Sequence, residues 1–193
     1  MKTKEIIGSW TKGYALDQHT TSSIFLGYYP NGTPIFDTKR SEIGELVYEC
    51  KYQQVKKNVD KLTDICLKFI QDWEIAIDII LPIPSSKQRE WHITHEIAES
   101  LGFMLMKECN TRLIKKVKET AEIKSISEDN VRRKELEGAF EIPENSLRGK
   151  NVLFIDDLYS SGSTMDTVCK IAKDNGAANE VYVLALTYAR SRQ

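Results

Sequence analysis

The chain has 193 residues, of which 41% are hydrophobic and 28% are charged, a composition typical of a soluble globular domain. Lys and Arg (27) nearly balance Asp and Glu (28), so the net charge of -1 provides no global basic field and argues against direct nucleic-acid binding. No apolar run approaches the roughly 20 residues of a membrane span, and the polar start of the chain shows no secretory signal, so we expect no membrane partner.

The cysteines favour a cytoplasmic protein. Cys50, Cys66, Cys109 and Cys169 are far apart and form no CxxC pair. This spacing argues against a zinc site and indicates reduced thiols. Most of them are expected to be small residues of the core.

Residues 1–40 are predicted to form a small N-terminal β appendage. Two β-prone runs, 25–29 and 34–36, flank the pair Asn31-Gly32. Asn-Gly between two such runs is typical of a hairpin turn, so a hairpin is expected here.

From Ser41 onward the apolar residues follow a helical spacing. Apolar positions between 43 and 50 share one face, and serine is a preferred N-cap residue. Between 55 and 73, apolar residues recur at steps of three and four. Two amphipathic helices are therefore predicted, the first capped by Ser41.

The middle of the chain predicts a strand, a helix and a second strand. The apolar run 75–81 reads as a buried strand that ends at Pro82. A helix over 93–101 would stop at Gly102, because glycine commonly ends helices. The short run 103–106 would then form another strand.

The stretch 115–137 is densely charged. One interpretation is a solvated loop or helix face, and another is a mobile lid over an anionic substrate. A third, direct DNA binding, predicts a steep salt dependence and is the weakest, given the near-zero net charge. The basic residues that stand out are Lys115, Lys116, Lys118, Arg132, Arg133 and Lys134.

The end of the chain predicts a strand-helix-strand unit. The runs 152–155 and 181–186 are continuously apolar, and residues 165–172 between them have a helical apolar face that ends at Gly176. Unbroken apolar strands belong to parallel sheets that are covered on both faces. The fold class is therefore α/β, with 41–193 as its main domain.

Two adjacent acids, Asp156 and Asp157, follow the first of these strands. They stand where open α/β sheets bind ligands, and carboxylates accept hydrogen bonds from ribose hydroxyls and hold Mg²⁺ directly or through water. Small residues come next, whose backbone N–H groups can approach a phosphate at a helix start. A polar turn that only caps the helix is the alternative. The small residues are Ser160, Ser161, Gly162, Ser163 and Thr164.

The segment 152–164 resembles the phosphoribosyl-diphosphate (PRPP) binding motif of type I phosphoribosyltransferases, and residues 41–188 are similar to the ComF-like, competence-associated branch. The resemblance implies that Asp156 and Asp157 contact the ribose hydroxyls, act in catalysis and hold Mg²⁺. The loop Ser160 to Thr164 would bind the ribose phosphate. A type I phosphoribosyltransferase-like, parallel-centred sheet flanked by helices is also implied, as is a homodimer.

The stretch 80–87 falls where that branch has its diphosphate-binding loop. By the resemblance, Ser85, Ser86, Lys87 and Arg89 would bind the diphosphate, and Lys87 would assist catalysis by neutralising the departing group. The chain departs from the branch at 91–95, where Trp-His-Ile-Thr-His replaces the usual Arg-Gly-Phe-Asn-Gln.

The implied activity is transfer of phosphoribosyl from PRPP to an unidentified acceptor with Mg²⁺-dependent release of diphosphate. The departure at 91–95 gives weight to an alternative, a non-catalytic protein that senses PRPP or a nucleotide, or that is associated with DNA uptake. The branch's N-terminal cysteine-rich zinc module is missing, and His19, in the region that replaces it, matches no motif.

Overall fold

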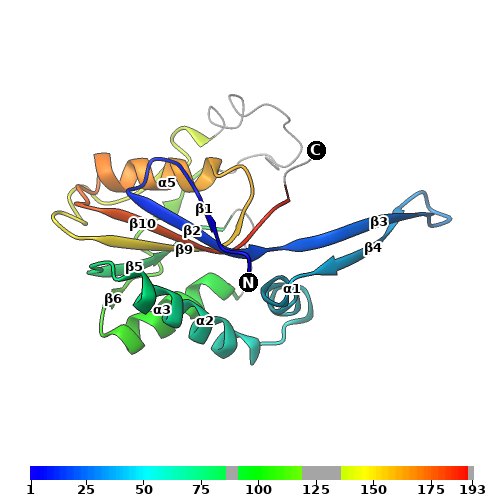
Figure 1. The fold of residues 1–193 in the computed structure, drawn as a ribbon. Coiled ribbons are helices and arrows are strands. Elements are labelled where there is room, and N and C mark those ends of the chain that lie inside the picture. Colours follow the sequence, from blue (N-terminus) through cyan, green and yellow to red (C-terminus); the bar gives the residue numbers. More distant parts are fainter. Residues whose placement is uncertain (86–90, 119–135, 191–193) are drawn as a thin grey trace.

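A six-stranded sheet forms the centre of the protein in the computed structural model, which describes residues 1–85, 91–118 and 136–190 (Figure 1). The strand order is β1-β2-β10-β9-β5-β6, and all neighbours are parallel except β1 and β2. The predicted α/β class, with a parallel-centred sheet flanked by helices, is confirmed. The strands are β1 (Lys4–Glu5), β2 (Lys12–Gln18), β5 (Ile79–Pro82), β6 (Glu108–Cys109), β9 (Val152–Tyr159) and β10 (Val181–Tyr188).

Helices cover both faces of this sheet. Helices α1 (Glu42–Gln53), α2 (Asn58–Trp73) and α3 (Ile93–Leu105) lie on one face, and α5 (Ser163–Asp174) lies on the other (Figure 1). The two layers explain the unbroken apolar runs, because alternate residues of one strand enter opposite cores. In β9, Phe154 packs in the core beneath α5, whereas Leu153 packs in the core beneath α1 to α3.

The N-terminal region is divided differently from the predicted appendage. Strands β1 and β2 belong to the main sheet, where β2 pairs in parallel with β10. Only β3 (Thr20–Tyr28) and β4 (Pro34–Arg40) stand apart, as the antiparallel hairpin that the Asn-Gly pair predicts (Figure 1). Gly32 takes a positive φ of 80° in the turn, a conformation that favours glycine. The division of the chain into two domains stays a prediction.

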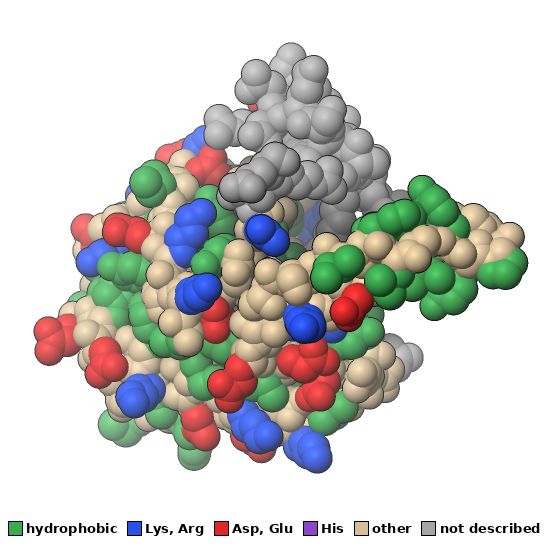
Figure 2. Space-filling model, turned by 45° about the vertical axis from the view of Figure 1, so that its right-hand side comes forward, with side chains coloured by type: hydrophobic (Ala, Val, Ile, Leu, Met, Phe, Trp, Pro, Cys, Tyr) green, Lys and Arg blue, Asp and Glu red, His purple; other side chains and the backbone are tan. Residues whose placement is uncertain are grey.

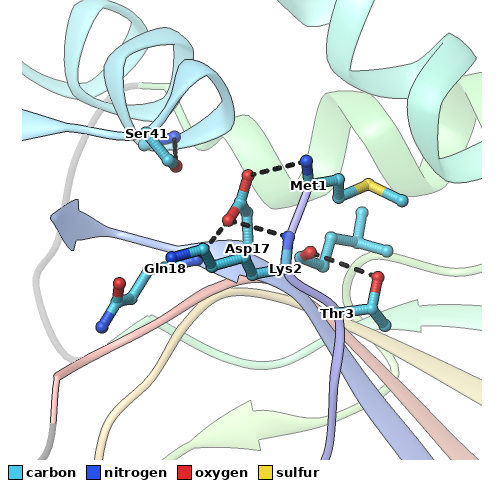
Figure 3. Close-up of polar contacts among 8 residues, drawn as sticks. Met1, Lys2, Thr3, Asp17, Gln18 and Ser41 are labelled. Atoms are coloured by element: carbon cyan, nitrogen blue, oxygen red, sulfur yellow. Dashed lines mark hydrogen bonds and ion pairs between the residues drawn. The ribbon is translucent and has the colours of Figure 1, made fainter.

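Polar contacts hold the N-terminal residues against the end of β2 (Figure 3). The backbone N–H groups of Lys2 and Gln18 donate to Asp17 Oδ1 at 3.1 and 2.8 Å, and the Met1 ammonium lies 3.8 Å from Asp17 Oδ2. Asp17 is only 6% exposed, so these donors compensate a carboxylate that would otherwise be costly to bury.

The predicted N-cap of the first helix, Ser41, is confirmed in α1. The predicted end of the helix over 93–101, at Gly102, is wrong. The Gly44 N–H donates to Ser41 Oγ at 3.0 Å, which caps α1. Helix α3 continues through Gly102 to Leu105, so residues 103–106 form no strand, and Met106 takes the left-handed C-cap position. Gly102 serves close packing, because an added Cβ would lie 2.9 Å from Cys109 Cβ.

Two smaller findings bear on the composition. Among the described residues, no helix is both long enough and apolar enough to cross a membrane. All four cysteines are free, and Cys50, Cys66 and Cys169 are buried, as expected for core residues. Burial raises the pKa of Cys66 to about 12, which keeps it a neutral thiol.

A further two-stranded sheet pairs β7 (Lys115–Lys116) with β8 (Phe140–Glu141).

Candidate functional site

The predicted site lies where the parallel strands end. Strand β5 stops at Pro82, opposite Ile155, whereas β9 remains paired with β10 as far as Tyr159. Asp156 and Asp157 therefore lie inside β9, in a stretch that has lost its neighbour on the β5 side. The sequence predicted the strand to end at 155, and continued pairing with β10 accounts for the difference. This edge, with loops leaving several strands, is the usual ligand position of an α/β sheet.

The two acids differ in their contacts. Asp157 pairs with Lys51 of α1, Oδ2 to Nζ, at 2.7 Å, with 22% and 19% of the two side chains exposed. Asp156 accepts a hydrogen bond from the Asp157 N–H at 2.8 Å. Both acids are half-buried. Asp157 has a cation as its partner, whereas Asp156 accepts from a backbone N–H group.

The surroundings of Asp156 disfavour the ionised form of its carboxyl. Burial raises its pKa well above the usual carboxyl range, and the neighbouring Asp157 carboxylate raises it further. The backbone N–H groups of Asp157 and Leu158 and the charge of Lys51 oppose this only in part. A ligand that donates hydrogen bonds, or a cation, would favour the ionised form of this carboxyl.

A histidine that the sequence left uninterpreted belongs to the same edge. The Thr187 hydroxyl donates to the backbone carbonyl of Asp157 at 2.7 Å, and His19 Nδ1 lies 3.1 Å from Thr187 Oγ1. Burial lowers the pKa of His19, and the charges of Lys51 and Arg40 lower it further against the opposing Asp157 and Glu45. This shift favours the neutral imidazole of His19, and Thr187 of β10 connects that ring to the backbone of Asp157.

The small-residue loop leads directly into α5. Gly162, with φ 76°, is the N-cap residue and has no side chain to cap the helix, while the Ser163 N–H of the first turn donates to Ser161 Oγ at 3.4 Å. Helix N-terminal N–H groups without such a cap can bind an anion. Ser160 and Ser161 are exposed, Gly162 and Thr164 half-buried, and Ser163 buried. Two of the hydroxyls interact with each other, since Ser161 Oγ lies 3.0 Å from Ser163 Oγ.

A small hollow of about 80 Å³ adjoins this loop. Ile7, Trp10, Tyr159 and Asp166 line it together with loop residues, so the N-terminal segment closes one side of the α5 start. The Ser9 N–H holds that segment by donating to Asp166 Oδ1 at 2.8 Å. A larger hollow, of about 470 Å³, lies on α2 and α3 and contains none of the predicted site residues.

Part of the predicted diphosphate site can be placed. Ser85 is exposed and follows β5, and the nearby Ile83 N–H donates to the Ile155 carbonyl at 2.9 Å, so this connection starts beside Asp156. Ser86, Lys87 and Arg89 lie outside the described residues, as does the stretch 119–135 of the predicted lid. Lys51 belongs to the stretch that resembles the ComF-like branch, but the sequence assigned it no role, because no local pattern joins an α1 lysine to the end of β9.

Asp156 and Asp157 alone provide few ligand atoms for Mg²⁺. Within the described ranges, no cluster of three or more His, Cys, Asp or Glu side chains could hold a metal ion. Asp156 and Asp157 provide two carboxylates, and Lys51 already pairs with the second. Mg²⁺ often keeps several waters and binds through one or two carboxylates plus substrate phosphates. The acids therefore fit a metal that is held mainly by a ligand, not by the protein alone.

The fold is that of the phosphoribosyltransferases. The adenine phosphoribosyltransferase of Leishmania tarentolae superposes with a TM-score of 0.51 at 12% sequence identity, over 97% of this chain and 94% of that one. In sequence, the chain is 31% identical over 103 residues to competence protein ComFC of Bacillus subtilis (strain 168). That match covers 53% of this chain and 41% of the relative, so it spans about two fifths of ComFC. No protein-family model matches the chain. The structural likeness confirms the predicted phosphoribosyltransferase-like fold, and the sequence likeness confirms the predicted resemblance to the ComF-like branch over 103 residues.

Proposed function

We propose that the protein binds PRPP and transfers its phosphoribosyl group to an acceptor, with release of diphosphate. The observation that carries this proposal is the end of β9, where an acid pair is followed five residues later by Gly162, the N-cap residue of α5, which has no side chain to cap the helix. One element thus presents hydrogen-bond acceptors and the next presents N–H donors. A ribose phosphate needs both, in that order.

In this proposal the ribose hydroxyls donate to Asp156 and Asp157, and the 5-phosphate accepts from the N–H groups at the start of α5. Lys51 pairs with Asp157 at 2.7 Å and holds it in position. The raised pKa of Asp156 supports the assignment, because hydroxyl donors would favour the ionised form of this carboxyl. Perturbed carboxyls of this kind cluster at functional sites.

The chemistry would be a displacement at the anomeric carbon. A nucleophile of the acceptor forms a bond to that carbon, and the bond to the diphosphate oxygen breaks with its electron pair leaving on diphosphate. Mg²⁺, held by the ligand's phosphates and by Asp156 and Asp157, would supply neutralising charge when bound. Lys87 would add to that charge, with Ser85, Ser86 and Arg89 as further diphosphate ligands. Most of the catalysis would come from positioning the sugar between the acids and α5.

Calorimetry tests the binding step. Wild-type protein with PRPP and Mg²⁺ should give saturable heat, and the pair of changes Asp156→Asn and Asp157→Asn should weaken binding by a factor of about 100 or more, since two charge-assisted contacts are lost. Asp37→Asn is the matched control, because Asp37 lies on the hairpin and away from β9. Absence of binding by the wild type, or equal binding by the acid-pair variant, would refute the proposal.

A second candidate function is a sensor that binds PRPP or a nucleotide without turnover, as in a regulator or in DNA-uptake machinery. The stretch 91–95 favours it, because the residues typical of the ComF-like branch are replaced there. In the structure His92 and His95 occupy this stretch with ring centroids 4.9 Å apart. Diphosphate release measured with purine, pyrimidine and amine acceptors separates the two. Binding without release for any acceptor would favour the sensor.

A further inference from the structure

The proposed function does not use the hollow of about 470 Å³ on helices α2 and α3. These helices lie on the face of the sheet opposite α5 (Figure 1). The volume of the hollow falls within the range of small-molecule sites, about 300–1,000 Å³. Three acidic residues, two residues with hydroxyl groups and two apolar residues line it, and this combination indicates the kind of ligand that would fit.

The charges in the lining are all negative. Asp60 and Asp64 come from α2 and Glu99 from α3, and all three are exposed. No described Lys, Arg or His lines the hollow, and none of the three carboxylates forms an ion pair with a residue that the structure describes. The lysines of α2, Lys61 and Lys68, are absent from the lining. Acidic and basic side chains are mixed over the lower part of Figure 2, where these helices lie, so the negative charge is a local property of the hollow.

A buried hydroxyl without a partner belongs to the same hollow. Thr63 is 2% exposed, and its Oγ1 has no hydrogen-bond partner among the described residues. Buried hydroxyls are nearly always paired, because an unpaired one has lost its hydrogen bonds to water without replacement. Thr63 shares one face of α2 with Asp60 and Asp64, since residues three and four apart lie above one another on a helix. A ligand that carries N–H donors would supply the donor that this oxygen lacks.

The spacing of the carboxylates selects the kind of cation. Within the described ranges, no three His, Cys, Asp or Glu side chains are placed to hold one metal ion. Asp60 and Asp64 are one helical turn apart, a separation of about 5–6 Å between Cβ atoms, and Glu99 comes from the neighbouring helix. Carboxylates that are spread in this way need several positive charges at separate places. Ammonium groups joined by short methylene chains have such a spacing.

The apolar part of the lining suits the methylene chains. Phe103 is 87% exposed and Met104 is 48% exposed, so both present apolar surface beside the carboxylates. An aromatic face attracts an ammonium group, and the flexible Met side chain adapts to irregular ligands. We propose that this hollow binds a linear aliphatic polyamine. Its ammonium groups pair with the three carboxylates and donate to the Thr63 hydroxyl, while its methylene chain packs against Phe103 and Met104.

An NMR titration of the full chain with spermidine tests this proposal without PRPP, at about 20 mM salt, where screening is weak. Amide resonances of α2 and α3 should shift saturably. Asp60→Asn with Asp64→Asn should raise the dissociation constant of spermidine about fivefold or more, because two ion pairs are lost. Asp72→Asn with Glu74→Gln is the matched control, since it removes two exposed charges at the end of α2 that do not line the hollow, and it should change the dissociation constant less than about twofold.

Thr63→Val separates a ligand contact from a structural role. Val replaces the unpaired hydroxyl by a methyl group, so the melting temperature should stay the same or rise, while spermidine should bind about threefold more weakly or less tightly still.

Three further ligands define the specificity of the hollow. Butylamine, with one ammonium group, should not saturate it, and Mg²⁺ should displace spermidine no more than NaCl of equal ionic strength does. A tri-lysine peptide should bind more weakly than spermidine, and tighter binding would assign the hollow to a protein segment and overturn the proposal. Absence of saturable shifts in α2 and α3, equal affinity of the acid-pair variant and its control, or displacement by Mg²⁺ beyond the effect of NaCl would also overturn it.

Discussion

Replacing Asp156 by asparagine should make the protein more stable at neutral pH while it weakens ligand binding. Asn keeps the shape of the side chain and the acceptor oxygen for the Asp157 N–H, but removes the charge. A buried polar group with incomplete compensation costs about 1–3 kcal/mol, and more when charged. Lys51 and two backbone N–H groups compensate in part, so we expect a gain of about 1–2 kcal/mol in the free energy of unfolding at pH 8.

The direction of the pKa shift determines how the stability difference between Asp156→Asn and the wild type changes with pH. The pKa of Asp156 in the folded protein lies above that of an unfolded Asp, about 3.9. Below pH 4 the carboxyl is protonated in both states and contributes no difference. As the pH rises from there, the folded state keeps a proton that the unfolded state has lost, so the wild type loses stability. The advantage of Asp156→Asn should therefore be small near pH 4 and complete above the folded pKa.

Urea unfolding at pH 4.5 and pH 8, followed by circular dichroism, measures this difference. Asp157→Asn is the comparison, because it removes both the ion pair with Lys51 and the charge that raises the Asp156 pKa; these two effects oppose each other, so it should raise the stability at pH 8 less than Asp156→Asn does. Equal stability of Asp156→Asn and the wild type at pH 8, or a gain that shrinks as the pH rises, would show that the carboxyl is not strained by its surroundings.

Three further changes test other parts of the structure. Gly162→Ala should cost about 1–2 kcal/mol and reduce PRPP binding, because a Cβ at φ 76° would lie 2.7 Å from the Tyr159 ring; thermal unfolding and calorimetry measure both effects. Ser41→Ala should cost about 1 kcal/mol through loss of the α1 cap, measured by urea unfolding with Ser160→Ala as an exposed control. Phe154→Ala should cost about 3–5 kcal/mol by leaving a cavity beneath α5, and a loss under 1 kcal/mol would contradict the buried position.

The sequence predicted the C-terminal unit well because its signals are local. The apolar runs of β9 and β10 and the spacing of α5 each lie within one short segment, and so does the step from Asp157 to Ser160. Strand β2 was missed as part of the main sheet because its partner β10 lies more than 160 residues away along the chain. A long-range pairing of this kind leaves no periodic signal in either segment.

Other residues were misjudged for reasons of packing. Gly102 was taken as a helix stop, but its role is to let α3 approach the residues around Cys109. Lys51 and His19 received no role, since one sits on a helix and the other between two strands, and only the folded chain brings them to Asp157 and Thr187. The motif 152–164 therefore predicts part of the site from sequence, whereas the contacts of Lys51 and His19 form only in the folded chain.

The placement of Trp10 gives this protein a natural optical reporter. Its ring meets Tyr159 edge-on at 6.4 Å between centroids, and its indole N–H donates to the Ile6 carbonyl at 2.9 Å, so it is rigidly seated against the loop before α5. Trp73 lies in a separate aromatic group with Tyr14. Changes in emission on adding a ligand could thus be assigned by comparison with Trp10→Phe, which would make unlabelled protein sufficient for rapid-mixing kinetics.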